Sequence, residues 1–187
     1  TYAVLHLEDT PFRLYEPAVA WSRLTVTLSK NSFRLAASEL SFLQRDPRIV
    51  VIPINPFQAA SLDAKVYSIA RDPFRFPEAV LISNGGQGYG EVPFKLDQAL
   101  PGYVRMDNRL LRRLFGDFSP SRGDLVLSKT GELLGVMVSS ELCAMVDSFL
   151  PMATLQTGNL EGQDVVGIVD RIQSRVGTRA PSRAGGR

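Results

Sequence analysis

The chemistry that this sequence could carry centres on a histidine, an aspartate and a serine that follow one another along the chain. His6 is the only histidine, while Asp46 and Ser121 each lie just ahead of an apolar run. A serine hydroxyl is a weak nucleophile unless a histidine takes its proton and a carboxylate orients that histidine. The order His6, Asp46, Ser121 therefore makes a hydrolase with a serine nucleophile one hypothesis for this chain.

The residues around Ser121 predict a β-hairpin. Ser121 opens a polar turn that ends at Asp124, and two apolar runs follow at 125–127 and 133–138. A short loop that contains Gly131 separates these runs, which is typical of two antiparallel strands joined by a tight connection. We therefore expect Ser121 in a tight turn directly before the first strand of a hairpin.

The rest of the chain predicts many short strands. Turn residues recur every 8 to 12 residues, about the spacing of a sandwich or a barrel pair. Pro53 is expected to mark a strand end, because proline cannot donate to a ladder. The segment 55–62 is expected to be a loop, and Asn84–Gly90 is expected to be a glycine-rich hairpin tip. The further predicted strands are 2–8, 24–28, 33–43, 49–54, 64–70, 78–83 and 103–106, with 142–146 and 152–155 extending the sheet.

One helix is predicted near the end of the chain. Asp164 is a suitable N-cap, and Gly177 follows the last turn. Between them, apolar residues recur at steps of three and four, which indicates an amphipathic helix packed on the body of the protein. The fold class that follows is all-β, with two packed barrels or one sandwich and a C-terminal helix over 164–176.

Composition narrows the classes of function. The last 17 residues hold five arginines and no acid, so the remaining 170 residues carry 16 basic and 19 acidic residues, a balance of −3. A mildly acidic body argues against nucleic acid as a partner. No apolar run reaches the length of a membrane span, and one histidine with one cysteine, Cys143, predicts neither a metal site nor a cofactor. The first residue is Thr1 rather than methionine, from which we expect a piece of a larger protein, and the compartment stays open.

The order of the sequence blocks resembles that of trypsin-like serine peptidases of the bacterial Deg type. Their nucleophile lies in G-x-S-G-G-P, followed by a strand, a turn and G-x-(apolar)-(apolar)-G-(apolar). Here the serine column is Ser121, and the later glycines are Gly131 and Gly135. The resemblance implies two six-stranded barrels closed by a helix: a first barrel over 1–62, a second over 63–158, the helix within 159–177 and a basic tail over 178–187.

The catalytic columns depart from the family pattern. In this alignment Ala18 stands at the histidine column, Arg48 stands at the aspartate column, and Arg122 replaces a glycine beside Ser121. His6 would then lie on the first strand and face away from the cleft. The resemblance therefore implies an inactive homologue in which Ser121 is a vestige. Two alternatives stay open: a chance likeness with an ordinary turn serine, and a working triad of His6, Asp46 and Ser121.

The function predicted on this basis is a non-catalytic binding or scaffold module. Arg122 and Gly123 of the serine turn, with Arg48 on the rim, are the expected binding residues. The groove between the barrels is expected to hold an extended or acidic peptide segment. A nucleic-acid-binding barrel is the weaker rival, because the basic stretches hold few aromatic residues for stacking.

Overall fold

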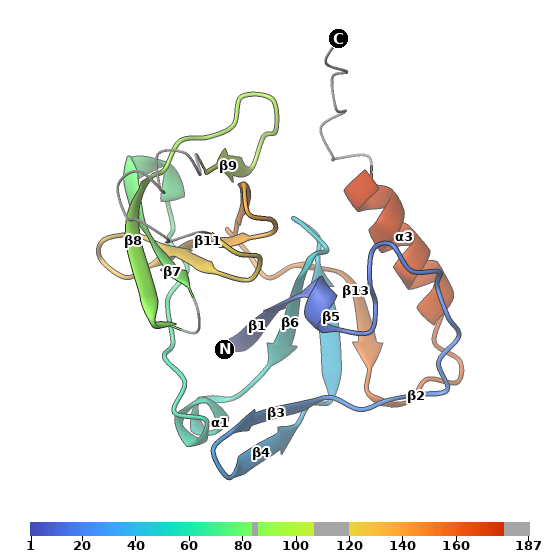
Figure 1. Ribbon diagram of the computed structural model, residues 1–187. Coiled ribbons are helices and arrows are strands. Elements are labelled where there is room, and N and C mark those ends of the chain that lie inside the picture. Colours follow the sequence, from blue (N-terminus) through green and yellow to red (C-terminus); the bar gives the residue numbers. More distant parts are fainter. Residues whose placement is uncertain (84–85, 107–119, 178–187) are drawn as a thin grey trace.

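The computed structural model describes residues 1–83, 86–106 and 120–177, and it is mostly β with a C-terminal helix, as the sequence predicts (Figure 1). The predicted basic tail and the first two residues of the glycine-rich tip, 84–85, lie outside the described residues. The strands are β1 (Tyr2–His6), β2 (Arg23–Leu24), β3 (Thr27–Lys30), β4 (Phe33–Ala36), β5 (Glu39–Leu43), β6 (Ile49–Pro53), β7 (Glu78–Ser83), β8 (Gly88–Pro93), β9 (Tyr103–Arg105), β10 (Leu125–Leu127), β11 (Leu133–Met137), β12 (Leu142–Met145), β13 (Pro151–Gln156) and β14 (Gly158–Asn159). The helical elements are η1 (Leu7–Asp9), α1 (Pro56–Ser61), η2 (Pro73–Arg75) and α3 (Val165–Gly177).

The first sheet has four strands in the order β1-β6-β5-β13, all antiparallel to their neighbours. The central strand β6 is buried from Ile49 to Ile52, which explains its continuous apolar sequence. It ends at Pro53, as predicted from the missing donor. The hairpin of β3 and β4 forms a separate two-stranded ribbon beside this sheet.

The second sheet has six strands in the order β8-β7-β10-β11-β12-β9 and forms a half-barrel. Strands β10, β11 and β12 follow one another as hairpins, and β9 lies beside β12, which is a Greek-key arrangement. Leu96, just past the end of β8, bridges to Val104 of β9. The two ends of the curved sheet therefore approach each other.

The chain returns to the first sheet after it completes the second. Strand β13 pairs with β5, and β14 pairs with β2. The sequence assigned 63–158 to the second barrel, and β13 within that range pairs with a strand of the first sheet. An apolar pattern predicts that 152–155 is a strand, but it carries no information on which sheet the strand joins.

Three apolar clusters hold these parts together. One fills the first sheet, a second fills the half-barrel, and a third lies between the two sheets. The third cluster joins Ile49 and Val51 of β6 to Val136 of β11, and all three side chains are almost fully buried. The two sheets are thus joined by a continuous apolar core. This core holds the sheets in position on either side of the groove described below.

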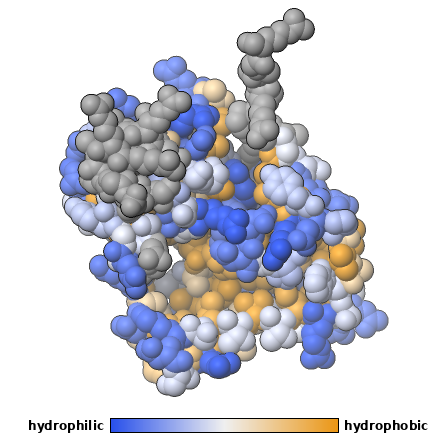
Figure 2. Space-filling view, viewed as in Figure 1, coloured by the Kyte–Doolittle hydropathy of each residue, from blue (hydrophilic) through white to orange (hydrophobic). Residues whose placement is uncertain are grey.

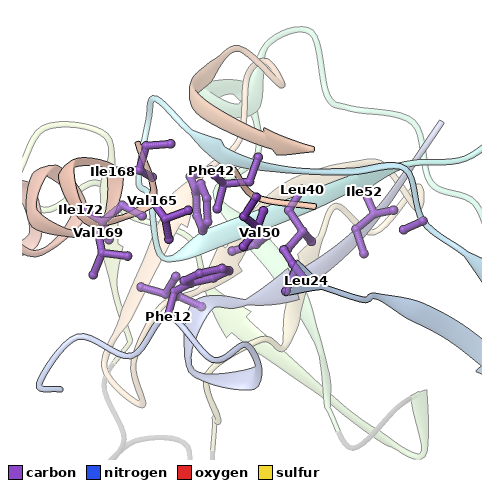
Figure 3. Packing of buried hydrophobic residues seen from close by; sticks show 14 of the residues in the cluster. Phe12, Leu24, Leu40, Phe42, Val50, Ile52, Val165, Ile168, Val169 and Ile172 are labelled. Atoms are coloured by element: carbon purple, nitrogen blue, oxygen red, sulfur yellow. The ribbon is translucent and has the colours of Figure 1, made fainter. Parts of the chain in front are cut away.

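Helix α3 covers the first cluster. Val165, Ile168, Val169 and Ile172 are buried at the predicted helical spacing and turn toward Phe12 and Phe42 (Figure 3). The predicted N-cap is confirmed, because Asp164 accepts a hydrogen bond from the amide of Gly167 at 3.0 Å.

Four local predictions differ from the structure. The predicted strand 24–28 is interrupted at 25–26, and the predicted strand 33–43 divides into β4 and β5, which pair with different strands.

The segment 55–62, expected as a loop, contains helix α1, which begins with a capping box in which Asn55 and Gln58 bond each other's backbone amides. The sequence signal for this helix was the combination of Asn55, Pro56 and Gln58. The segment 64–70, expected as a strand, contributes only an isolated bridge from Ile69 to Leu133.

None of the described helices combines the length and the apolar character needed to cross a membrane.

The packing of α3 yields a stability prediction. Replacing Ile172, which is 1% exposed, with alanine should lower the free energy of unfolding by about 2–5 kcal/mol, because it leaves a cavity in the first cluster. Val166 of the same helix is 38% exposed, so Val166→Ala should change the free energy of unfolding by less than about 0.5 kcal/mol. Urea denaturation measures both, and equal losses would contradict the orientation of the helix.

Candidate functional site

A groove of about 980 Å³ lies where the two sheets meet. Its walls include His6 at the end of β1, Glu8 in η1, the serine turn and the chain that follows β11. Both His6 and Ser121 line it, so the expectation that His6 faces away from the cleft differs from the structure. The groove brings together two of the three residues of the hypothetical triad.

The serine turn is held by hydrogen bonds that its backbone amides donate. The amide of Ser121 donates to Asp124 Oδ2 at 2.8 Å, and the amide of Gly123 donates to the carbonyl of Met137 at 2.7 Å. Gly123 has φ of +87°, a left-handed conformation that favours glycine. These bonds tie the turn to β11, and a Cβ built on Gly123 would lie 3.8 Å from the Cβ of His6. The turn therefore presents Ser121 and Arg122 beside the histidine.

Both ring nitrogens of His6 are engaged with backbone groups. Nδ1 accepts a hydrogen bond from the amide of Glu8 at 3.1 Å, and Nε2 lies 3.3 Å from the carbonyl oxygen of Val138. A carbonyl only accepts, so Nε2 carries the proton and Nδ1 does not. The imidazole is thus held as one neutral tautomer whose unprotonated nitrogen already has a donor.

The surroundings of His6 favour the neutral ring. Burial lowers the pKa of His6 from its ordinary value of 6.5, and the positive charges of Arg122 and Arg48 add to this effect. The hydrogen bond to Val138 and the charge of Asp9 oppose the lowering of the pKa only in part. The ring is 2% exposed, which accounts for the dominance of burial.

Asp46 is buried and fully engaged elsewhere. Its carboxylate accepts hydrogen bonds from the Arg48 guanidinium, the shortest at 2.6 Å, from the Arg48 amide at 2.9 Å and from the Tyr103 hydroxyl at 2.8 Å. The side chain is 1% exposed, and it makes no hydrogen bond to His6 among the residues that the structure describes. Asp46 therefore links the turn before β6 to β9 of the second sheet rather than orienting the histidine.

The serine itself has no base. Ser121 is exposed, and its hydroxyl makes no hydrogen bond within the described ranges 1–83, 86–106 and 120–177. A general base must lie within hydrogen-bond reach of the proton that it takes. His6 lines the same groove but directs both nitrogens to backbone partners, so the structure does not join Ser121, His6 and Asp46 by hydrogen bonds.

The residues at the two catalytic columns of the alignment, Arg48 and Ala18, lie in different parts of the structure. Arg48, at the aspartate column, lines the groove and neutralises Asp46. Ala18, at the histidine column, packs against the first apolar cluster and is not among the groove residues, where His6 and Glu8 lie instead. The difference arises because the chain turns directly after β1 through η1, which places residues 6–8 at the junction of the sheets.

Sequence reasoning missed the partners that define this site. The Tyr103 hydroxyl, the Val138 carbonyl and the Glu8 amide fix Asp46 and His6. Two of these contacts span 57 and 132 residues of sequence, and one pattern within a strand cannot reveal them.

The single cysteine, Cys143, is buried, and burial raises the pKa of its thiol. The described residues contain no cluster of three or more metal-ligand side chains.

No protein-family model, no curated protein and no solved structure matches this chain. Any functional assignment therefore depends on the geometry of the groove.

The bond from Tyr103 to Asp46 should contribute measurably to stability. Tyr103→Phe removes one hydrogen bond to a buried carboxylate, and we expect the free energy of unfolding to fall by about 1.5–3 kcal/mol. Tyr67→Phe is the matched control, because the Tyr67 hydroxyl makes no hydrogen bond to the described residues, and its effect should stay below about 0.5 kcal/mol. Similar values for the two variants in thermal denaturation would show that the link between the sheets contributes little.

The lowered pKa of His6 predicts a pH dependence. Above pH 6.5 the ring is neutral in both folded and unfolded chains, so its contribution to stability is complete. As the pH falls below 6.5, the unfolded chain takes up a proton that the folded chain refuses, and stability falls until the folded pKa is reached. The slope cannot exceed about 1.4 kcal/mol per pH unit, the value for one proton.

His6→Gln provides the control for this effect, because glutamine donates to the Val138 carbonyl without titrating. The difference in unfolding free energy between wild type and variant should change between pH 7 and pH 5. A constant difference over that range would contradict a lowered pKa.

Proposed function

We propose that this chain is a non-catalytic binding module on a two-barrel scaffold of trypsin-like type, and that its groove holds an extended peptide segment bearing a carboxylate. The observation that carries the non-catalytic part is the tautomer of His6. Its one unprotonated nitrogen already accepts the Glu8 amide, so it offers no lone pair to a serine hydroxyl.

Several features support the scaffold. The second sheet follows a Greek-key order, and the bridge from Leu96 to Val104 draws its ends together. Each sheet has its own apolar cluster with a third between them, and the final helix packs on the first cluster. Two packed barrels followed by a helix would have these properties.

The arginines of the groove support a carboxylate ligand, and the acidic Glu8 of its wall accepts the amide of Leu14. Arg48 is neutralised by Asp46, and Arg105 is paired with Asp97 and Glu141. Arg122 is exposed and has no ion-pair partner among the described residues. A free guanidinium binds a carboxylate through two parallel hydrogen bonds, which gives both affinity and orientation.

The groove also offers polar groups for a peptide backbone. Ser121 is exposed, and Ser139 and Ser140, which follow β11, also line the groove. Hydroxyl groups can bond the backbone of a peptide whatever its sequence. The arrangement therefore favours a ligand that is bound through its backbone and one acidic side chain.

Binding is tested with a fluorescein-labelled peptide of alternating alanine and glutamate, measured by fluorescence anisotropy. Arg122→Glu should weaken binding about tenfold, because a charge-assisted hydrogen bond contributes about 1.5–3 kcal/mol. Arg34→Glu makes the same charge change on the exposed face of β4 and should leave the affinity within about twofold. Equal effects of the two variants would contradict binding in the groove.

Catalysis is tested separately with a fluorophosphonate probe, which labels activated serines. We expect no labelling of Ser121. Labelling that disappears in both Ser121→Ala and His6→Ala would contradict this proposal and support a working serine hydrolase.

A further inference from the structure

A second cavity, of about 820 Å³, lies beside β1. Tyr2 and Val4 line it from β1, Leu28 lines it from the β3–β4 hairpin, and Leu62 lines it from the segment that leads to the second sheet. Figure 2 shows apolar side chains gathered across the middle of the molecule, above the β3–β4 hairpin. Among the described residues, none lines both this cavity and the groove at the serine turn. The cavity is therefore a second, separate site.

The cavity opens onto the apolar cluster that lies between the two sheets. Ile69, Ile82, Leu125 and Phe149 pack against this cluster, remain only partly buried, and all line the cavity. Ligand sites in proteins have volumes of about 300–1,000 Å³ and are lined mainly by apolar side chains, with a few polar groups that orient the ligand. The size and the lining of this cavity therefore favour a ligand with an extended apolar part.

One positive charge of the lining has no acidic partner. Lys65 is exposed and lines the cavity, and it forms no ion pair with the described part of the chain. Lys30, also in the lining, is instead neutralised by Asp63 at 2.9 Å. Asp124, the remaining acid of the lining, is 9% exposed and accepts the amide of Ser121 within the serine turn. A ligand with a single negative charge would therefore pair with Lys65.

Tyr67 supplies a hydrogen-bond donor beside this charge. The Lys65 ammonium lies 5.8 Å from the centre of the Tyr67 ring, so the two side chains share one part of the lining. Tyr67 is half-buried, and its hydroxyl makes no hydrogen bond to the residues that the structure describes. An ammonium and a phenol hydroxyl can both donate to one carboxylate. A phosphate group would carry more negative charge than one lysine balances, which favours a monocarboxylate.

We propose that this cavity binds a free medium-chain fatty acid. Its carboxylate would accept hydrogen bonds from Lys65 and Tyr67, and its alkyl chain would lie against the partly buried edge of the cluster between the sheets. Because Lys65 is exposed, the charged end of the ligand stays in contact with water while the chain is buried. The proposal does not depend on the function proposed for the groove.

The test titrates sodium octanoate and sodium decanoate into the full chain by isothermal titration calorimetry, each below the concentration at which it forms micelles. Decanoate should bind about tenfold more tightly than octanoate, because it buries two further CH₂ groups. Methyl NMR locates the ligand: the signals of Leu28, Leu62 and Ile82 should shift with decanoate, whereas that of Ile172, in the first cluster, should not.

Two variants test the carboxylate contact. Lys65→Met should weaken decanoate binding about fivefold, and Tyr67→Phe should weaken it about threefold, because each removes one donor to the carboxylate. Both should leave the binding of 1-octanol, which has no charge, within about twofold. Lys95→Met is the matched control, because Lys95 is exposed and is not among the cavity residues, and it should leave the affinity for decanoate within about twofold.

Three results would overturn the proposal. The first is an absence of decanoate binding up to the onset of micelle formation. The second is an equal effect of Lys65→Met and Lys95→Met, which would show that the carboxylate does not select this site. The third is a set of methyl shifts that leaves out Leu28, Leu62 and Ile82, which would place the ligand elsewhere on the protein.

Discussion

The carboxylate of Asp46 imposes the strictest constraint on this structure. A buried anion is unfavourable unless positive charge and hydrogen-bond donors surround it. Arg48 and Tyr103 supply them, and in doing so they fix the turn that starts β6 and tie it to β9 of the other sheet. The junction of the two sheets, and hence the groove, is shaped around this compensated charge.

The hydrogen bonds of Asp46 also determine whether this residue can orient His6. Asp46 cannot orient His6 while its oxygens receive Arg48 and Tyr103, and His6 is oriented instead by the backbone on either side of it. The chain thus contains a histidine, an aspartate and a serine in the order expected of a serine hydrolase, while the hydrogen bonds of His6 and Asp46 hold the fold together. The order of such residues along the sequence is therefore weaker evidence for catalysis than the hydrogen-bond partner of each side-chain nitrogen and oxygen.

The sequence predicted several helices and strands whose signal lies within a few neighbouring residues. The apolar run of β6, the hairpin of β10 and β11 and the cap of α3 were all visible in short windows. The placement of His6 and the pairing of β13 with β5 were not, because both depend on segments more than 100 residues apart. Helix α1 was missed although its capping box is local, because its six residues are too short for an apolar period to appear.

The return of β13 to the first sheet has a consequence for biosynthesis. Strands β7 to β12 occupy one continuous stretch, so the half-barrel has all its strands as soon as that stretch leaves the ribosome. The first sheet begins with β1 but lacks β13 until residues 151–156 have been made. The apolar residues that β13 and α3 cover in the folded protein lack that cover during this interval, and such exposed surface favours aggregation and chaperone binding. The first sheet, which begins before the half-barrel in the sequence, is therefore completed after it.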